Sequence, residues 1–276
     1  MLGTIVFQSH PALGTMCFHN KVVLITGASS GIGAACALRF AKSSASLSLV
    51  GRNFDNLTKI SHQCEEFNHL KPHIIVADIT SDDDIEKIVE ETVNAFGKLD
   101  VLINNAGVNS VLTAHSTSEA YDRVMTTNLR GTYMLTNKVI PFLIKTKGNI
   151  VNMSSILSDK PLTIMTPYCM SKAALDMFTK CKALQLGPKG IRVNAVNPGP
   201  VKTQLFKRGG MSDADCDKMF SELEINTPLK KIAKGSDVAE LVAFLASDRT
   251  KWFYHYWLNH YDTQLERENK PINFLM

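Results

Sequence analysis

The sequence lacks a strong charge of either sign and any long apolar run, and both absences exclude classes of protein. Its 276 residues include 30 Lys and Arg against 26 Asp and Glu, a formal net charge of +4, and these charges are spread along the chain. Without a basic stripe, no nucleic-acid partner is expected. The longest apolar runs are about as long as a strand, whereas a membrane-spanning helix needs roughly 20 residues. No membrane span is therefore predicted.

Cysteine pairs with the spacing of a zinc or redox site are also missing. The six cysteines are scattered, and none forms a C-x-x-C pair: Cys17, Cys36, Cys64, Cys169, Cys181 and Cys216. Scattered cysteines in a chain of this length indicate reduced thiols in an intracellular, cytoplasmic protein, and they predict no metal site.

Basic residues are absent from residues 1–15, although a signal peptide or a mitochondrial presequence needs them. Residues 1–18 are therefore expected to form a disordered lead-in. Hydrophobic residues make up 45% of the chain, which is enough for one large core, and no repeat or Pro/Gly-rich linker divides it. The prediction is a single domain over residues 19–248, followed by a C-terminal tail over residues 249–276.

What the sequence does contain is a regular alternation of short apolar segments with helical patterns. Strands are predicted at residues 22–26, 47–50, 74–77, 101–103, 149–153 and 191–196. Helices are predicted at residues 31–43, from the N-cap Ser81 to Gly97, and at 118–128, 131–145, 166–186 and 236–247, the last capped by Ser236. This alternation is typical of an α/β protein with a doubly wound parallel sheet. The weakly patterned residues 199–226 are expected to form a lid or a small helical subdomain.

A glycine-rich segment follows the first predicted strand and opens the first predicted helix. It comprises Gly27, Ala28, Ser29, Ser30, Gly31, Ile32 and Gly33. Glycines in that position let backbone N–H groups approach a pyrophosphate, and the helix N-terminus attracts its negative charge. We interpret the segment as a dinucleotide-binding loop, with a plain turn as the alternative.

The second predicted strand ends at Gly51 and Arg52, where an NAD site would offer a carboxylate to the ribose 2′-hydroxyl. The planar fork of Arg52 suits a 2′-phosphate instead, so NADP(H) is favoured over NAD(H). A surface arginine in a turn is the alternative. Asp78 ends the third strand and is expected to hold the adenine amino group, with Ile79 near the ring. The alternative for Asp78 is a turn cap.

Tyr168 and Lys172 lie four residues apart in the predicted helix 166–186, so their side chains share one face. The pKa of a free tyrosine is about 10, too high for a base near neutrality. A nearby ammonium group lowers a pKa by roughly 1–3 units at close range. Lys172 is therefore expected to lower the pKa of Tyr168, which exchanges a proton with a substrate oxygen. An exposed pair on an amphipathic helix is the alternative.

Ser155 follows the fifth predicted strand, at the sheet edge where doubly wound folds bind their ligands. Its hydroxyl is expected to bond the substrate oxygen and to stabilise charge that develops there. Ser154 is the competing residue, with a strand-end hydrogen bond as its plainer role. The amide of Asn128, late in helix 118–128, is expected to hold a water in a proton path to Lys172. A helix-interrupting Asn is the alternative.

Two further turns follow strands at the same sheet edge. The turn after the fourth strand is expected to lie under the adenosine ribose: Asn104, Asn105, Ala106 and Gly107. The turn after the sixth strand is expected to bind the nicotinamide end, through Pro198, Gly199, Val201 and Thr203, which follow Asn197. Each alone is consistent with a simple turn, but together the strand ends favour one shared binding site.

These motifs resemble the short-chain dehydrogenase/reductase family over about residues 20–247, and they occur in family order. The matching positions are Thr26, Gly27, Gly31 and Gly33; Asn104, Asn105, Ala106 and Gly107; Asn128, Ser155, Tyr168 and Lys172, where the family keeps its catalytic tetrad; and Asn197, Pro198, Gly199 and Thr203. The chain is most similar to the 3-oxoacyl-acyl-carrier-protein reductase-like members. The resemblance implies a Rossmann-type fold, hydride transfer between NAD(P)H and a small carbonyl or alcohol, and commonly a homodimer or homotetramer.

The chain departs from the family pattern after Asp248. The family continues into a Thr-Gly turn and a seventh strand, whereas this chain has an aromatic run over residues 252–257. The sequence therefore predicts neither the family's seventh strand nor its usual oligomer contact, and without that strand the edge of the sixth strand would be unpaired. A cofactor-binding regulatory protein that has lost turnover is the alternative to an enzyme, and a partner or membrane-surface contact through the aromatic run is a weaker one. His255 and His260 are interpreted as incidental rather than as metal ligands.

Overall fold

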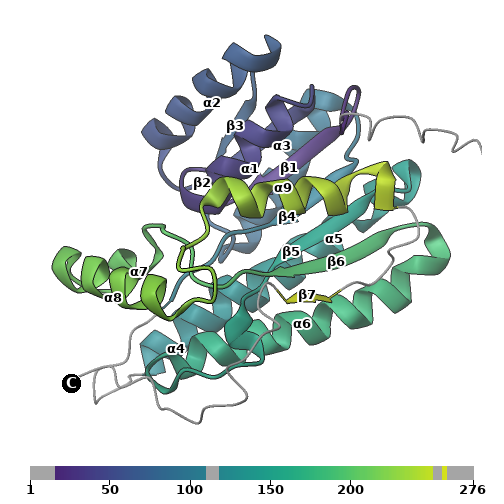
Figure 1. Cartoon of the computed structure of the whole chain (residues 1–276). Helices are drawn as coiled ribbons and strands as arrows, with labels where there is room; N and C mark the ends of the chain where they lie inside the picture. The colour runs from purple at the N-terminus through teal and green to yellow at the C-terminus, as the bar shows by residue number, and fades with distance from the viewer. Residues whose placement is uncertain (1–15, 110–117, 251–256, 260–276) are drawn as a thin grey trace, which may run out of the picture.

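The computed structural model describes residues 16–109, 118–250 and 257–259. Within them, seven parallel strands form one sheet in the order β3-β2-β1-β4-β5-β6-β7 (Figure 1). The strands are β1 (Val22–Thr26), β2 (Ser46–Gly51), β3 (His73–Val76), β4 (Val101–Asn104), β5 (Asn149–Met153), β6 (Arg192–Asn197) and β7 (Trp257–Asn259). The predicted doubly wound α/β fold is confirmed, and β1 to β6 lie within one residue of their predicted bounds.

Helices cover both faces of the sheet. The described α-helices are α1 (Gly31–Ala41), α2 (Phe54–Asn68), α3 (Asp82–Phe96), α4 (Ser118–Met125), α5 (Thr132–Thr146), α6 (Thr166–Leu186), α7 (Leu205–Arg208), α8 (Asp213–Asn226) and α9 (Gly235–Ala246). Buried side chains of α1, α2 and α9 form one core with Val23 and Ile25 of β1. Those of α3, α5 and α6 form the other core with Val22 and Leu24. Successive β1 side chains thus enter opposite cores, which explains the continuous apolar run of this strand.

The ends of α3 agree with the sequence prediction. The Ser81 hydroxyl accepts a hydrogen bond from the Asp84 N–H at 3.3 Å, and Gly97 ends the helix with a left-handed φ of 73°. At α9 the prediction of Ser236 as the cap is wrong. Lys234 is the N-cap residue.

Helix α2 occupies residues 54–68, where the sequence predicts no helix. Asn53 caps it by accepting a hydrogen bond from the Asn56 N–H at 2.8 Å. Only Leu57, Ser61 and Cys64 are buried along its length, so its apolar stripe is too short to stand out as a helical pattern.

A π-helical turn, Thr126–Gly131, joins α4 to α5, where the sequence predicts the end of one helix and the start of the next. Such turns occur frequently at functional sites. A Cβ atom on Gly131 would lie 2.4 Å from the Ile79 carbonyl oxygen. The turn therefore packs directly against the loop after β3, and it carries Asn128.

The described domain extends beyond both predicted boundaries. Phe18 is 2% exposed and packs edge-on against Phe40 with a ring separation of 4.8 Å. Thr250 is fully buried, and its hydroxyl accepts a hydrogen bond from Arg192 at 3.0 Å. Phe18 thus belongs to the core rather than to a disordered lead-in, because a buried aromatic ring contributes substantially to packing.

A short seventh strand is present, although the sequence departs from the family pattern in this region and did not allow it to be predicted. β7 pairs in parallel with residues 195–197 of β6. Residues 1–15, 251–256 and 260–276, which include His255 and His260, lie outside the described residues. Within the described ranges, none of the helices combines the length and apolar character that crossing a membrane requires.

Candidate active site

The carboxyl ends of β1 and β4 are joined by Thr26 and Asn105. The Thr26 hydroxyl accepts hydrogen bonds from the N–H groups of Asn105 and Ala106, each at 3.0 Å. The Asn105 amide donates to the carbonyls of Thr26 at 2.9 Å and Gly27 at 3.2 Å. Asn105 therefore anchors the glycine loop to β4, and its expected place under the adenosine ribose stays a prediction.

The glycine loop has features that suit a nucleotide pyrophosphate. Gly27 and Gly31 adopt left-handed φ values of 66° and 58°, a region that favours glycine. A Cβ atom on Gly33 would lie 2.2 Å from the Gly27 carbonyl oxygen, so α1 packs directly on the loop. Ser30, the N-cap residue of α1, makes no side-chain capping hydrogen bond. The first N–H groups of the helix therefore need another partner, and an anion fits that requirement.

The segment after β6 lies beside the glycine loop. The predicted nicotinamide-binding positions in it are Pro198, Gly199, Val201 and Thr203. The Pro198 carbonyl accepts a hydrogen bond from the Ile156 N–H at 3.0 Å. A Cβ atom on Gly31 would lie 3.4 Å from the Thr203 methyl group. Val201 forms a bridge with Ala233. The structure therefore brings the two predicted cofactor segments together.

Arg52 and Asp78 form an ion pair at the ends of β2 and β3. Their side chains lie 3.3 Å apart, and that of Arg52 is 68% exposed. Asp78 also accepts hydrogen bonds from the N–H and the hydroxyl of Thr80 at 3.0 and 2.9 Å. Burial opposes the charge on Asp78, but the bonds from Thr80 and the charge of Arg52 outweigh it and lower the Asp78 pKa. Asp78 thus caps a turn, and contacts of Asp78 and buried Ile79 with adenine stay predictions.

Lys172 of α6 is buried against the end of β5. Its side chain is 3% exposed, and Nζ donates a hydrogen bond to the Met153 carbonyl at 2.7 Å. Burial lowers the pKa of Lys172 to about 8, although the charge of Asp176 opposes this shift. The Gly107 backbone passes close by, since a Cβ atom there would lie 3.6 Å from Nζ. A buried ammonium group needs a hydrogen-bond partner, and the Met153 carbonyl holds this one in a fixed position, unlike the ammonium of a surface lysine.

Tyr168 lies beside Lys172, as the spacing predicts, with Nζ 5.5 Å from the ring centre. The sequence predicts that the pKa of Tyr168 is lowered, and for the protein without a bound cofactor this prediction is wrong. Burial raises the pKa of Tyr168 to about 12, although a hydrogen bond with Ser155 opposes this rise. The apolar surroundings disfavour the phenolate more than the hydrogen bond favours it.

Ser155 and Ser154 make different contacts after β5. The Ser155 hydroxyl contacts Tyr168 and accepts a hydrogen bond from the Leu157 N–H at 3.1 Å. The Ser154 hydroxyl donates to the Lys172 carbonyl at 3.3 Å and is 3% exposed. Ser154 therefore makes a structural bond at the strand end, and Ser155 is the serine beside the phenol.

The Asn128 side chain forms three hydrogen bonds with other protein groups. Its Oδ1 accepts from the Val108 N–H at 2.8 Å, and its Nδ2 donates to the Val108 carbonyl at 2.9 Å and to the Ser171 hydroxyl at 3.0 Å. These bonds take both donors and one of the two acceptor positions of the amide, so the expected water on Asn128 stays a prediction. Asn128 also fixes the loop after β4 to α6.

Asp176, which no sequence motif predicts, is a further buried polar residue close to Ser155 and Lys172. It is 6% exposed and lies one turn after Lys172 on α6. Its Oδ2 accepts a hydrogen bond from the Asn197 amide at 2.8 Å, and Asn197 also donates to the Ser155 carbonyl at 3.2 Å. The four-residue spacing from Lys172 is the signal that could have identified it.

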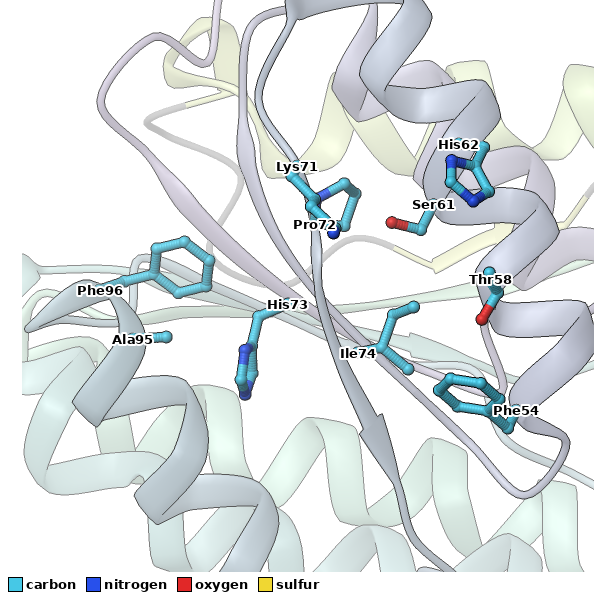
Figure 2. Close-up of a pocket in the computed structure, with 10 residues that line it drawn as sticks. All are labelled: Phe54, Thr58, Ser61, His62, Lys71, Pro72, His73, Ile74, Ala95 and Phe96. Atoms are coloured by element: carbon cyan, nitrogen blue, oxygen red, sulfur yellow. The ribbon is translucent and has the colours of Figure 1, made fainter.

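A pocket of about 500 Å³ lies elsewhere, at the outer edge of β3. Figure 2 shows that its lining comes from α2, the segment before β3, β3 and α3: Phe54, Thr58, Ser61, His62, Lys71, Pro72, His73, Ile74, Ala95 and Phe96. None of the predicted site residues is among them. In the described ranges, His, Cys, Asp and Glu form no group of three or more suited to a metal ion.

Comparison with known proteins places the chain in a family. The short chain dehydrogenase family matches residues 21–212. The 3-oxoacyl-(acyl-carrier-protein) reductase of Thermotoga maritima is 34% identical over 240 residues, which cover 86% of this chain and 94% of that protein. The chain therefore belongs to the short-chain dehydrogenase/reductase family.

Solved structures of similar proteins agree with this assignment. The L-sorbose reductase of Gluconobacter frateurii, complexed with NADPH and L-sorbose, has a TM-score of 0.79 and 29% identity, covering 86% of this chain and 93% of that one. The 3-ketoacyl-(acyl-carrier-protein) reductase of Brucella melitensis, complexed with NADH, has a TM-score of 0.77 and 31% identity, covering 85% and 93%. The protein is an NAD(P)-dependent oxidoreductase that acts on CH–OH groups or the corresponding carbonyls.

Proposed function

We propose that this enzyme reduces a ketone or aldehyde with NADPH, or catalyses the reverse oxidation, through Tyr168, Ser155, Lys172 and Asn128. The observation that carries the proposal is the buried contact of the Tyr168 hydroxyl with Ser155, beside the Lys172 ammonium. The net reaction adds a hydride from NADPH and a proton to the C=O group, and gives an alcohol and NADP⁺; Tyr168 donates the proton and regains one from water. A bound nicotinamide would supply that hydride.

The protonation states at neutral pH are those that the reduction step needs. With a pKa of about 12, Tyr168 keeps its proton at neutral pH and can donate it to a substrate oxygen. Lys172, with a pKa of about 8, is mostly charged at neutral pH and stabilises the phenolate that remains. Ser155 bonds the same oxygen, and Asn128 holds the loop after β4 in place.

Arg52 supports a preference for NADP(H). Its exposed guanidinium lies at the end of β2 and already binds the carboxylate of Asp78. A 2′-phosphate would be a second anionic partner for this fork, which suits bidentate binding. The glycine loop would hold the pyrophosphate at the N-terminus of α1, which has no side-chain cap. Its proposed binding residues are Gly27, Ser29, Ser30, Gly31, Ile32 and Gly33.

The alternative, a cofactor-binding protein without turnover, rested on the loss of the seventh strand. Because β7 pairs with β6, that reason is weakened, and the enzyme is the function we propose. The predicted cytoplasmic location stays a prediction.

We also propose that the chain forms a homodimer or homotetramer through α6. Met170, Met177 and Leu184 lie seven residues apart on this helix and are 47%, 58% and 74% exposed. An apolar stripe of this spacing is typical of a helix that packs on another helix. The variant Met177→Lys should then give a smaller species in light scattering, whereas an unchanged mass would contradict this assembly.

The proposed reaction is tested with Tyr168→Phe. Loss of the phenolic proton should lower kcat for carbonyl reduction by about 10²–10⁴-fold, while the thermal shift caused by NADPH persists. Tyr121→Phe is the matched control, since Tyr121 is 40% exposed on α4, and it should keep its activity. Unchanged turnover in Tyr168→Phe would remove Tyr168 from the reaction.

A further inference from the structure

Asn109 has a buried side-chain amide with no hydrogen-bond partner in the described part of the chain. The residue is 1% exposed, and both Nδ2 and Oδ1 are unbonded. A buried amide that loses its hydrogen bonds to water without replacement destabilises the folded protein. Such groups in native proteins need an explanation, and a missing ligand is one.

The backbone around Asn109 is held firmly, so the amide is not a loose side chain. Asn128 binds both the N–H and the carbonyl of the preceding Val108, at 2.8 and 2.9 Å. The Asn109 carbonyl accepts a hydrogen bond from Arg123 of α4 at 3.0 Å. The loop that carries the unbonded amide is thus fixed to the same residue that the proposed reaction uses.

The short helix α7 and the residue after it contact both Asn109 and the surroundings of Tyr168. A Cβ atom on Gly209, directly after α7, would lie 2.1 Å from Asn109 Oδ1. Leu205 and Phe206 of the same helix pack into the apolar cluster that contains Tyr168. Gly209 thus lies directly on the Asn109 amide. A substrate whose carbonyl meets Tyr168 would reach this amide by displacing Gly209 and extending under α7.

Apolar side chains dominate the packing around the phenol. The cluster with Tyr168 includes Val108, Leu157, Leu162, Ile164, Leu205 and Phe206. The raised pKa of Tyr168 has the same cause, since burial disfavours its phenolate. A polyol placed there would lose several hydrogen bonds to water without replacement, whereas an apolar skeleton would not.

We propose that Asn109 binds a hydroxyl group of an otherwise apolar ketone whose carbonyl is reduced at Tyr168. An amide presents an NH2 donor and a carbonyl acceptor side by side, and a single hydroxyl can form one hydrogen bond with each of them. This inference rests on the proposed function and names the substrate class of the same site: an apolar hydroxyketone, and in the reverse direction the corresponding diol.

The test compares wild type with Asn109→Leu, which keeps the branched shape and the number of side-chain heavy atoms and removes both polar atoms. The probes are matched pairs of ketones reduced with NADPH: cyclohexanone with 4-hydroxycyclohexanone, and 2-decalone with a hydroxy-2-decalone, together with D-fructose as a polyol. Wild type should prefer the hydroxylated member of a pair. In Asn109→Leu, kcat/KM for that member should fall about tenfold, while its partner changes less than about twofold.

Thermal unfolding separates this binding role from a structural one. Replacing an unbonded buried amide by an apolar group of similar shape should leave Tm unchanged or raise it. Asn104→Leu is the control, because the Asn104 amide donates to Thr136 at 3.0 Å and to Asn152 at 2.8 Å, and its Tm should fall.

Three results would overturn the inference: an unchanged preference within the pairs in Asn109→Leu, an equal fall for both members with a lower Tm, or wild-type preference for D-fructose over the cyclohexanone and decalone probes. Failure of the proposed function is distinct from these, since wild type would then reduce none of the carbonyl probes, and the inference would fall with it.

Discussion

The two ends of the proposed cofactor site differ in how their side chains are held. At the catalytic end, Lys172 is 3% and Asn128 is 1% exposed, and each is bonded to backbone groups of neighbouring elements. At the adenosine end, the Arg52 side chain is 68% exposed, and its partner Asp78 is 34% exposed. One end is a buried polar network, and the other is an ion pair in water.

This difference has energetic consequences. Buried charges and amides act in a low dielectric, where each lost partner has a large effect. Exposed ion pairs contribute about 0–1 kcal/mol because water and salt screen them. Chemistry at the catalytic end should therefore be sensitive to single substitutions, whereas cofactor preference at the adenosine end should change in small steps.

The largest effect is expected for Lys172→Met. It removes a preorganised buried charge, so kcat for reduction should fall by about 10²–10³-fold. Lys182→Met is the matched control, because Lys182 is also buried on α6 but bonds Asn137 at 2.7 Å, away from Tyr168. Steady-state kinetics with NADPH measures both. An equal loss in the two variants would mean that burial of any lysine in α6, rather than its position, sets activity.

Next in size is Gly33→Ala, at the junction between the two ends. The added Cβ atom would lie 2.2 Å from the Gly27 carbonyl oxygen, and such overpacking destabilises a protein by about 1–3 kcal/mol. Denaturant unfolding should show this loss. Gly187→Ala is the control, since no atom lies within 4 Å of its Cβ position, and it should be neutral. Equal stability of the two variants would contradict the close packing of α1 on the loop.

A smaller effect is expected for Arg52→Gln at the exposed end. The KM for NADPH should rise by roughly tenfold, the effect of one charge-assisted hydrogen bond, and the KM for NADH should change little. Arg130→Gln removes an exposed arginine that pairs with Asp82 at 2.9 Å, and it should alter neither value. If both cofactors respond equally to Arg52→Gln, the 2′-phosphate is not its partner.

The smallest effect is a change in pH dependence with Asp176→Asn. Burial lowers the pKa of Lys172 to about 8, and Asp176 partly opposes this. Activity that needs the ammonium is present below this pKa and is lost as the pH rises through it. Without the Asp176 charge the pKa falls further, so the alkaline limb should move to lower pH.

Two features of this experiment keep it specific. An asparagine can still accept the hydrogen bond from Asn197, so the packing is retained. Asp213→Asn, at an 80% exposed side chain, should leave the pH profile in place. A limb that stays where it is in Asp176→Asn would show that Asp176 does not act on Lys172.

Most of the fold could be predicted because parallel strands buried on both faces leave a strong pattern. The apolar run of β1 enters two cores at once, and α3 has a serine cap and a terminal glycine. Helix α2 could not be predicted in this way, since it buries few side chains. The cap of α9 depends on Lys234 and Asp237 rather than on Ser236.

The positions of the site residues were predictable, but their bonds were not. Spacing on one helix was enough to place Tyr168 beside Lys172. The direction of the Tyr168 pKa depends on how deeply the ring is buried, which is a property of packing. The role of Asn128 depends on partners that are distant in sequence, Val108 and Ser171.

The sequence by itself determined the order of the strands and helices, the glycine loop and the pair Tyr168 and Lys172, because these depend on local spacing and on the period of burial. Only the tertiary structure decided which serine meets the phenol, what Asn128 binds, and that the amide of Asn109 lies buried and unbonded beside Gly209. Those outcomes depend on contacts between segments far apart in the chain, and burial and hydrogen bonding are settled only when these segments pack together.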